Sequence, residues 1–111
     1  MGLFYLRHPD DDSQGGDLEL YKYKTNNFKY YGQRFIQDKY IEKVKTIKYE
    51  RNTLVIFLNS INSIHGVSNR SVTNHPRLFV NILGGQLREP LFSLDKYKEN
   101  IIDKVLRHLS N

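Results

Sequence analysis

The sequence contains no cysteine and no tryptophan, and it has only one methionine and three prolines. The absence of cysteine excludes disulfides and thiolate ligands, so any metal site built by this chain must use His, Asp or Glu. No apolar run approaches the roughly eighteen residues that span a membrane, and no charged segment followed by an apolar one marks a secretory signal. The sequence therefore predicts a cytoplasmic protein without a membrane segment.

The composition predicts one small folded domain over residues 1–111. Hydrophobic residues make up 39% and charged residues 26% of the chain, close to the average of globular proteins, which disfavours disorder throughout. The net charge of +5 favours contact with anions, from phosphate polymers to a small dicarboxylate, but it selects no particular partner.

Short β-strands dominate the pattern up to about residue 93. Residues 3–6 form an apolar run, and residues 17–24 alternate apolar and polar side chains with the period of a half-buried strand. Further runs rich in β-branched and aromatic residues predict strands at 44–49, 53–59, 63–68 and 77–83. The strands at 44–49 and 53–59 are expected to pair with each other, because only a short turn separates them. Residues 25–43 indicate an irregular excursion with a helical turn near 37–43.

A single α-helix is predicted at the C-terminal end, over about residues 95–109. Asp95 is placed to cap it, and apolar side chains recur at helical spacing at Tyr97, Ile101, Ile102, Val105, Leu106 and Leu109. Serial short strands without helices between them favour an antiparallel sandwich or barrel. The fold class expected is therefore all-β with one C-terminal α-helix.

Two stretches of this sequence carry a family resemblance. Residues 59–68 read Asn-Ser-Ile-Asn-Ser-Ile-His-Gly-Val-Ser, followed by Arg70 and by Arg-Leu-Phe-Val-Asn-Ile at 77–82; residues 4–6 read Phe-Tyr-Leu and residues 15–20 Gly-Gly-Asp-Leu-Glu-Leu. In this order the chain resembles the C-terminal part of the catalytic barrel of iron(II)/2-oxoglutarate-dependent dioxygenases, most closely the prolyl-hydroxylase-like members. The resemblance implies a partial double-stranded β-helix, or jelly roll, and an oxidoreductase that hydroxylates a peptide prolyl or similar substrate while oxidising 2-oxoglutarate to succinate.

The resemblance also assigns roles to individual residues. His65 matches the second iron-binding histidine, although a histidine beside a glycine is more often an ordinary turn residue. Arg77 matches the arginine that binds the distal carboxylate of 2-oxoglutarate, a task for which the forked guanidinium is suited. Arg70 is the fallback for that role, and Tyr5 is a further candidate for hydrogen bonding to the cosubstrate, although a tyrosine in such a strand is usually core.

Alternation along the strand that begins at Arg77 divides its side chains between two faces. Arg77, Phe79 and Asn81 are expected on the face that lines the site, and Leu78, Val80 and Ile82 on the opposite one.

One family feature is missing where the resemblance would place it. In the family, the first iron-binding histidine and the iron-binding carboxylate form an H-x-D or H-x-E pair, which lies upstream of the strand that matches residues 3–6 here. The resemblance therefore implies a truncated barrel in which His65 alone would hold iron, so the fragment is expected to be inactive. The pair His8-Pro9-Asp10 is an alternative source of metal ligands, but it follows the matching strand and falls in a predicted surface loop.

Two other function classes stay open. Residues 21–24 and 28–35 interleave tyrosine and phenylalanine with lysine and arginine, as a binder of single-stranded nucleic acid would, although such alternation is also natural on a solvated strand. A non-catalytic barrel used for protein contacts is the third possibility. A truncated barrel would also expose residues 3–6 as an open strand edge, which predicts a homo-oligomer formed through that edge.

Overall fold

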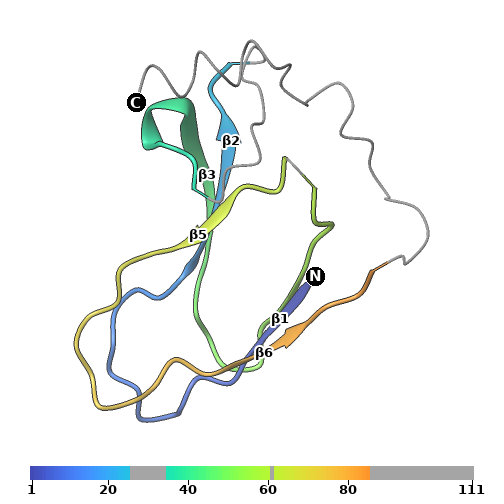
Figure 1. Ribbon diagram of the computed structural model, residues 1–111. Coiled ribbons are helices and arrows are strands. Elements are labelled where there is room, and N and C mark those ends of the chain that lie inside the picture. Colours follow the sequence, from blue (N-terminus) through green and yellow to red (C-terminus); the bar gives the residue numbers. More distant parts are fainter. Residues whose placement is uncertain (26–34, 61, 86–111) are drawn as a thin grey trace. The chain divides into compact units, whose positions relative to one another are not determined.

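The computed structural model describes residues 1–25, 35–60 and 62–85, and these residues form two three-stranded antiparallel sheets. The first sheet contains β1 (Gly2–Tyr5), β4 (Leu54–Ile56) and β6 (Phe79–Ile82) in the order β4-β1-β6. The second contains β2 (Leu18–Tyr23), β3 (Ile41–Ile47) and β5 (His65–Val67) in the order β3-β2-β5 (Figure 1). In this described part there is no α-helix, no closed barrel and no helix capable of crossing a membrane.

The predicted mostly-β architecture is confirmed, and each predicted strand has a counterpart. The helix predicted at 95–109 lies outside the described residues. In the described part of the excursion at 25–43, a 3-10 helix spans Asp38–Tyr40, and β3 begins directly after it.

The predicted pairing of residues 44–49 with 53–59 is wrong. β3 pairs with β2, whereas β4 pairs with β1 in the other sheet. The turn between them contains Asn52 with a φ of 63°, and the Asn52 N–H donates to the carbonyl of Tyr5 at 3.0 Å. The chain thus passes from one sheet to the other at this turn. Tyr49, at the start of this turn, is buried.

The expectation that residues 3–6 form an open edge is also wrong. β1 is the central strand of its sheet, because Gly2 lies opposite Ile56 on one side and opposite Ile82 on the other.

The core lies between the inner faces of the two sheets. Tyr5, Leu18 and Tyr49 are its fully buried members, and partly buried apolar side chains surround them: Leu3, Leu20, Ile47 and Val55. The rings of Tyr5 and Tyr49 meet edge to face, with centroids 5.2 Å apart. Odd-numbered residues of β1 therefore face the core, and even-numbered ones face away from it.

The chain divides into two compact units. The first comprises Met1–Lys22 and Lys43–Gly85, and every site residue discussed below belongs to it. The described part of the second covers residues 23–25 and 35–42, where the Lys24 N–H donates to the carbonyl of Tyr40 at 2.9 Å.

Candidate carboxylate-binding site

Arg77 lies just before β6, on the side of the strand that faces the core. Residues opposite one another in an antiparallel pair project to the same face. Tyr5 lies opposite Phe79, and Leu3 lies opposite Asn81. The register therefore agrees with the predicted division, which grouped Arg77 with Phe79 and Asn81.

The Arg77 guanidinium is held among aromatic rings. Its central carbon lies 4.9 Å from the ring centroid of Phe79, 5.0 Å from that of Tyr49 and 5.2 Å from that of Tyr5. Its Nε donates to the carbonyl of Gly16 at 2.8 Å. Among the described residues, no Asp or Glu forms an ion pair with Arg77. A half-buried positive charge is therefore left without a negative partner in this part of the chain.

Two buried polar atoms beside each other have no hydrogen-bond partner among the described residues: Nη2 of Arg77 and the hydroxyl of Tyr5. Leaving a buried donor unsatisfied costs about 1–3 kcal/mol, and more when the donor is charged. Burial raises the pKa of Tyr5, while the charge of the Arg77 guanidinium and its approach to the hydroxyl oppose that rise; the two groups do not reach the distance and alignment of a hydrogen bond. The hydroxyl thus stays protonated and can donate. Two adjacent donors, one of them charged, match the two oxygens of a carboxylate.

The Gly15-Gly16 pair allows the chain to pass close to the two arginines. Both glycines have positive φ, at 80° and 75°. A Cβ on Gly15 would lie 1.9 Å from the carbonyl oxygen of Asn69, which is backbone and cannot yield cheaply. At Gly16 the nearest atom would be Cδ of Arg70, at 3.1 Å. Because the backbone can come this close, the Gly16 carbonyl lies within hydrogen-bond distance of Arg77.

Arg70, the fallback for the carboxylate role, already has a carboxylate partner. Its Nη2 lies 2.6 Å from Oδ2 of Asp11, and its Nε donates to the Ser13 hydroxyl at 2.9 Å. Hydrogen bonds from Ser13, assisted by Arg70, hold the pKa of Asp11 well below its usual range. Arg7 adds hydrogen bonds from its Nη2 to the carbonyls of Asp11 and Ser13. Arg70 is therefore committed to fixing the loop, which favours Arg77 for an external anion.

His65 begins β5, on the edge of the second sheet. Its Nδ1 lies 2.7 Å from the carbonyl oxygen of Ser63. A carbonyl only accepts, so a hydrogen bond here requires the proton on Nδ1, and the neutral ring then carries its lone pair on Nε2. The ring also meets Phe57 at an angle of 61°, with centroids 5.0 Å apart. This is the arrangement that a metal-binding histidine uses, with one nitrogen donating to backbone and the other available.

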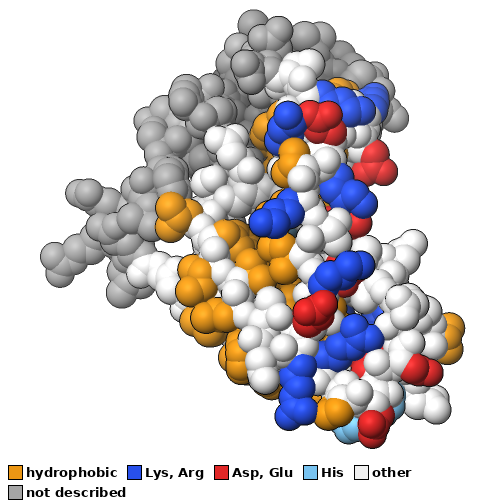
Figure 2. Space-filling model, turned by 180° about the vertical axis from the view of Figure 1, so that it is seen from behind, with side chains coloured by type: hydrophobic (Ala, Val, Ile, Leu, Met, Phe, Trp, Pro, Cys, Tyr) orange, Lys and Arg blue, Asp and Glu red, His pale blue; other side chains and the backbone are white. Residues whose placement is uncertain are grey.

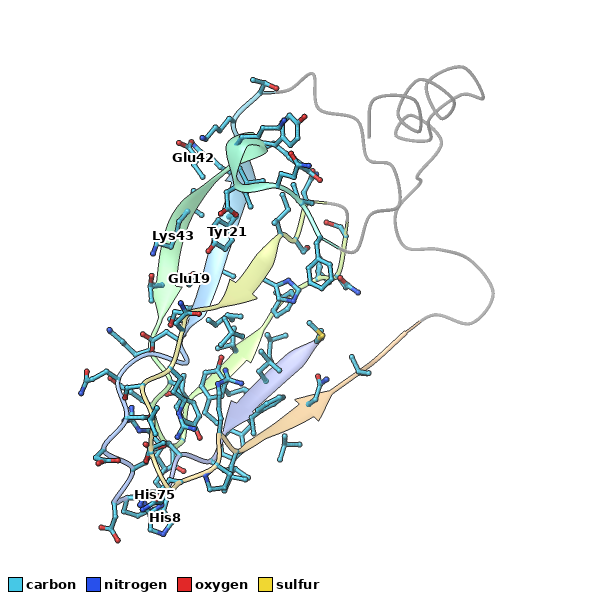
Figure 3. The ribbon with its side chains drawn as sticks, turned by 60° about the vertical axis from the view of Figure 1, so that its left-hand side comes forward. His8, Glu19, Tyr21, Glu42, Lys43 and His75 are labelled. Carbon is cyan, nitrogen blue, oxygen red and sulfur yellow. The ribbon has the colours of Figure 1, made fainter. Side chains whose placement is uncertain are left out.

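The other expected metal ligands do not join His65. Within residues 1–25, 35–60 and 62–85, no three His, Asp or Glu side chains come together as a metal site. His8 instead stacks on His75, with centroids 4.6 Å apart, and its Nδ1 accepts from the N–H of Asp10 at 3.1 Å. Figure 3 shows His8 and His75 side by side in the loops at one end of this unit. The described residues alone therefore do not fit iron.

Tyr49 is a site residue that the sequence reasoning did not identify. Its ring packs against Tyr5 and under the guanidinium of Arg77, and its hydroxyl bridges the backbone of Leu78. That hydroxyl accepts from the Leu78 N–H at 2.8 Å and donates to the Leu78 carbonyl at 3.2 Å. In the sequence, Tyr49 only ends a predicted strand, and nothing there indicates that its hydroxyl also binds the backbone of Leu78, just before β6.

The basic and aromatic stripe considered for nucleic acid is divided between two faces. Along β2, alternation places Tyr21 on the face opposite to Lys22. The Glu19 carboxylate accepts from Lys43 at 2.9 Å and from the Tyr21 hydroxyl at 2.6 Å, and these two bonds lower the pKa of Glu19 (Figure 3). Lys43 is thus paired with an acid. The part of the stripe at 28–34 lies outside the described residues.

Comparisons of the chain with protein-family models, with curated proteins and with solved structures found no match.

Proposed function

We propose that this chain is the C-terminal part of an iron(II)/2-oxoglutarate-dependent oxygenase barrel, of jelly-roll type, and that it binds the distal carboxylate of 2-oxoglutarate through Arg77 and Tyr5. The observation that carries the proposal is the pair of buried, unpartnered donors, Arg77 Nη2 and the Tyr5 hydroxyl. The family resemblance also points to these residues, to Arg77 for the distal carboxylate and to Tyr5 for hydrogen bonding to the cosubstrate. A carboxylate placed between them would satisfy both donors and neutralise the guanidinium.

The ring environment strengthens this site electrostatically. Tyr5 and Tyr49 are fully buried and Nη2 of Arg77 is itself buried, so water has restricted access to this donor, although Phe79 is exposed. An ion pair in such surroundings is stronger than one on an open surface, because the effective dielectric constant is lower. The Gly16 carbonyl holds Nε of Arg77 and so sets the direction of the remaining donors.

The catalytic metal would need further ligands. His65 can offer Nε2, but an iron site of this class needs a second histidine and a carboxylate, which the described residues do not bring to it. We therefore expect cosubstrate binding by this chain without turnover.

Binding of 2-oxoglutarate, measured by titration calorimetry without metal, tests the proposal. Arg77→Lys should weaken binding by at least tenfold, because it removes the charged hydrogen bond from Nη2, and hydrogen bonds to charged groups are worth about 1.5–3 kcal/mol. Arg51→Lys is the matched control, since Arg51 lies exposed in the turn before β4. Glutarate, which keeps the distal carboxylate but lacks the keto group, should bind similarly. Equal effects of the two substitutions, or no dicarboxylate binding at millimolar concentration, would refute the proposal.

The expectation of no turnover has its own test. With iron(II) and ascorbate, we expect no succinate from 2-oxoglutarate. Stoichiometric succinate that disappears in His8→Ala and in Asp10→Ala would show that these two residues supply the missing ligands.

A further inference from the structure

Three arginines lie around the ring of Tyr49. The central carbon of the guanidinium lies 5.0 Å from the ring centroid in Arg77, 5.5 Å in Arg7 and 5.9 Å in Arg70. Two of the three also approach one carboxylate, that of Asp11, whose Oδ2 lies 2.6 Å from Nη2 of Arg70 and 3.8 Å from Nε of Arg7. The side chain of Asp11 is fully buried. A carboxylate of the protein itself therefore serves as the anion for two of these arginines.

Arg70 and Arg77 lie close enough together to act on one anion. A Cβ on Gly16 would lie 3.1 Å from Cδ of Arg70 and 3.5 Å from Cδ of Arg77, so both side chains pass the same backbone position. Arg77 stays there, because its Nε donates to the Gly16 carbonyl. Arg70 turns away, toward the carboxylate of Asp11 and the hydroxyl of Ser13. The two arginines thus differ in their partners rather than in their location.

We propose that Asp11 determines which anion the site accepts, because it withholds Arg70 and so reserves the site for a carboxylate rather than a phosphate. This inference rests on the proposed carboxylate site at Arg77. With Arg70 engaged, the buried donors that lack a partner among the described residues are Arg77 Nη2 and the Tyr5 hydroxyl. Two donors satisfy the two oxygens of a carboxylate. A phosphate brings more charge and at least three strong acceptor oxygens, so it would leave some of them buried and unpaired.

The charge of Asp11 is secured by its surroundings. Hydrogen bonds from Ser13 and from the Arg70 guanidinium hold the pKa of Asp11 well below its usual range. The backbone N–H of Ser13 donates to Oδ1 of this carboxylate at 2.9 Å. Asp11 therefore stays ionised at physiological pH and keeps Arg70 engaged.

Titration calorimetry of the full chain with inorganic phosphate and with glutarate tests this assignment. The wild-type protein should bind glutarate at least tenfold more tightly than phosphate. Asp11→Ala should gain at least tenfold in affinity for phosphate, because the freed Arg70 adds a charged hydrogen bond. Asp10→Ala is the matched control, since it removes the same charge from the same loop but from a side chain that is 82% exposed. This control should change the affinity for phosphate less than twofold.

Binding of phosphate elsewhere on the surface is controlled by a second variant. On the face shown in Figure 2, acidic side chains are interspersed with the basic ones of the described residues, so a purely basic surface does not explain a gain in affinity there. Asp11→Ala combined with Arg70→Gln removes the freed guanidinium as well. This double variant should lose the affinity for phosphate that Asp11→Ala gains, and retention of that affinity would overturn the proposal.

The stability of Asp11→Ala gives a second measurement. The substitution leaves Arg70 partly buried without its carboxylate, so the variant should unfold more easily than the wild type. Phosphate should raise the Tm of Asp11→Ala more than that of Asp10→Ala, because a ligand that binds the folded state stabilises it. Equal responses of the two variants, or an Asp11→Ala that stays unfolded in phosphate, would overturn the proposal. If the wild type binds no glutarate but Asp11→Ala still gains phosphate, the carboxylate site is refuted and the exclusion of phosphate by Asp11 is upheld.

Discussion

Two neighbouring buried tyrosines should respond in opposite directions to loss of their hydroxyl groups. The Tyr5 hydroxyl has no partner among the described residues, whereas the Tyr49 hydroxyl makes two hydrogen bonds to the backbone of Leu78. The rings are in edge contact, so Tyr5→Phe and Tyr49→Phe remove the same atom from nearly the same environment. The difference between the two variants therefore isolates hydrogen-bond satisfaction.

The magnitudes follow from the cost of unsatisfied groups. Tyr5→Phe relieves a buried, unpartnered hydroxyl and should stabilise the ligand-free protein by about 1 kcal/mol, which raises Tm by about 4 °C. Tyr49→Phe leaves the N–H of Leu78 without its partner, while the Leu78 carbonyl keeps the hydrogen bond from the Leu6 N–H, and the change should destabilise by about 1–2 kcal/mol. Urea denaturation at one fixed protein concentration, without carboxylate buffers, measures both changes.

Saturating 2-oxoglutarate should reverse the order of stability of the wild-type protein and Tyr5→Phe. A ligand at a hundred times its Kd stabilises the folded state by about 2.7 kcal/mol, so the wild-type protein gains more than a variant that binds it weakly. Tyr5→Phe should then be more stable than wild type without ligand and less stable with it. If Tyr5→Phe destabilises the ligand-free protein as much as Tyr49→Phe does, the Tyr5 hydroxyl has a partner and the argument for a carboxylate site loses its basis.

Three further outcomes are expected from the loops and the surface. The pKa of Asp11 is lower in the folded than in the unfolded state, so the contribution of this carboxylate to folding stability is complete above about pH 4 and is lost as the pH falls below that value. Asp11→Asn should therefore be less stable at pH 7, and urea titrations at decreasing pH should show a smaller loss of stability for this variant than for the wild type. Gly15→Ala should lower Tm severely, because its φ of 80° and the 1.9 Å approach to the Asn69 carbonyl leave no room for a methyl group; a change under 2 °C, about 0.5 kcal/mol, would contradict that geometry. Lys43→Ala should change stability by at most about 0.5 kcal/mol, because its pair with Glu19 is solvent-exposed on the lysine side, and a larger loss in denaturant melts would show that this pair is not a surface one.

The sequence predicted the strands well because each of them carries a local signal. The alternation in residues 17–24 and the β-branched run in 53–59 located β2 and β4 to within a few residues. The partners of these strands were not readable in the same way. Whether β4 joins β3 or β1 depends on where the Asn52 turn directs the chain, and no periodicity encodes that.

At the site, too, features set by neighbouring residues could be predicted from the sequence, and contacts between distant residues could not. Alternation along the strand placed Arg77 with Phe79 and Asn81, in agreement with the register. The role of the loop at 7–16 was missed, because its acidic and glycine-rich composition is typical of a surface turn. Asp11 and Ser13 are nevertheless buried, since Arg70, far away in the sequence, brings a charge partner to them.

The central position of β1 also has a consequence for how the chain folds during synthesis. β1 precedes both of its neighbours along the chain, and it receives them from residues 54–56 and, later, from residues 79–82. At about 5–20 residues per second, the apolar stretch at 3–6 waits roughly 4–15 s before its second neighbour exists. Contacts this distant in sequence also make folding slow, because a long loop must close before any pairing repays its entropy. The stretch at 3–6 should therefore need protection by a chaperone during that interval, and a substitution that makes this stretch less hydrophobic should raise soluble yield even where it lowers final stability.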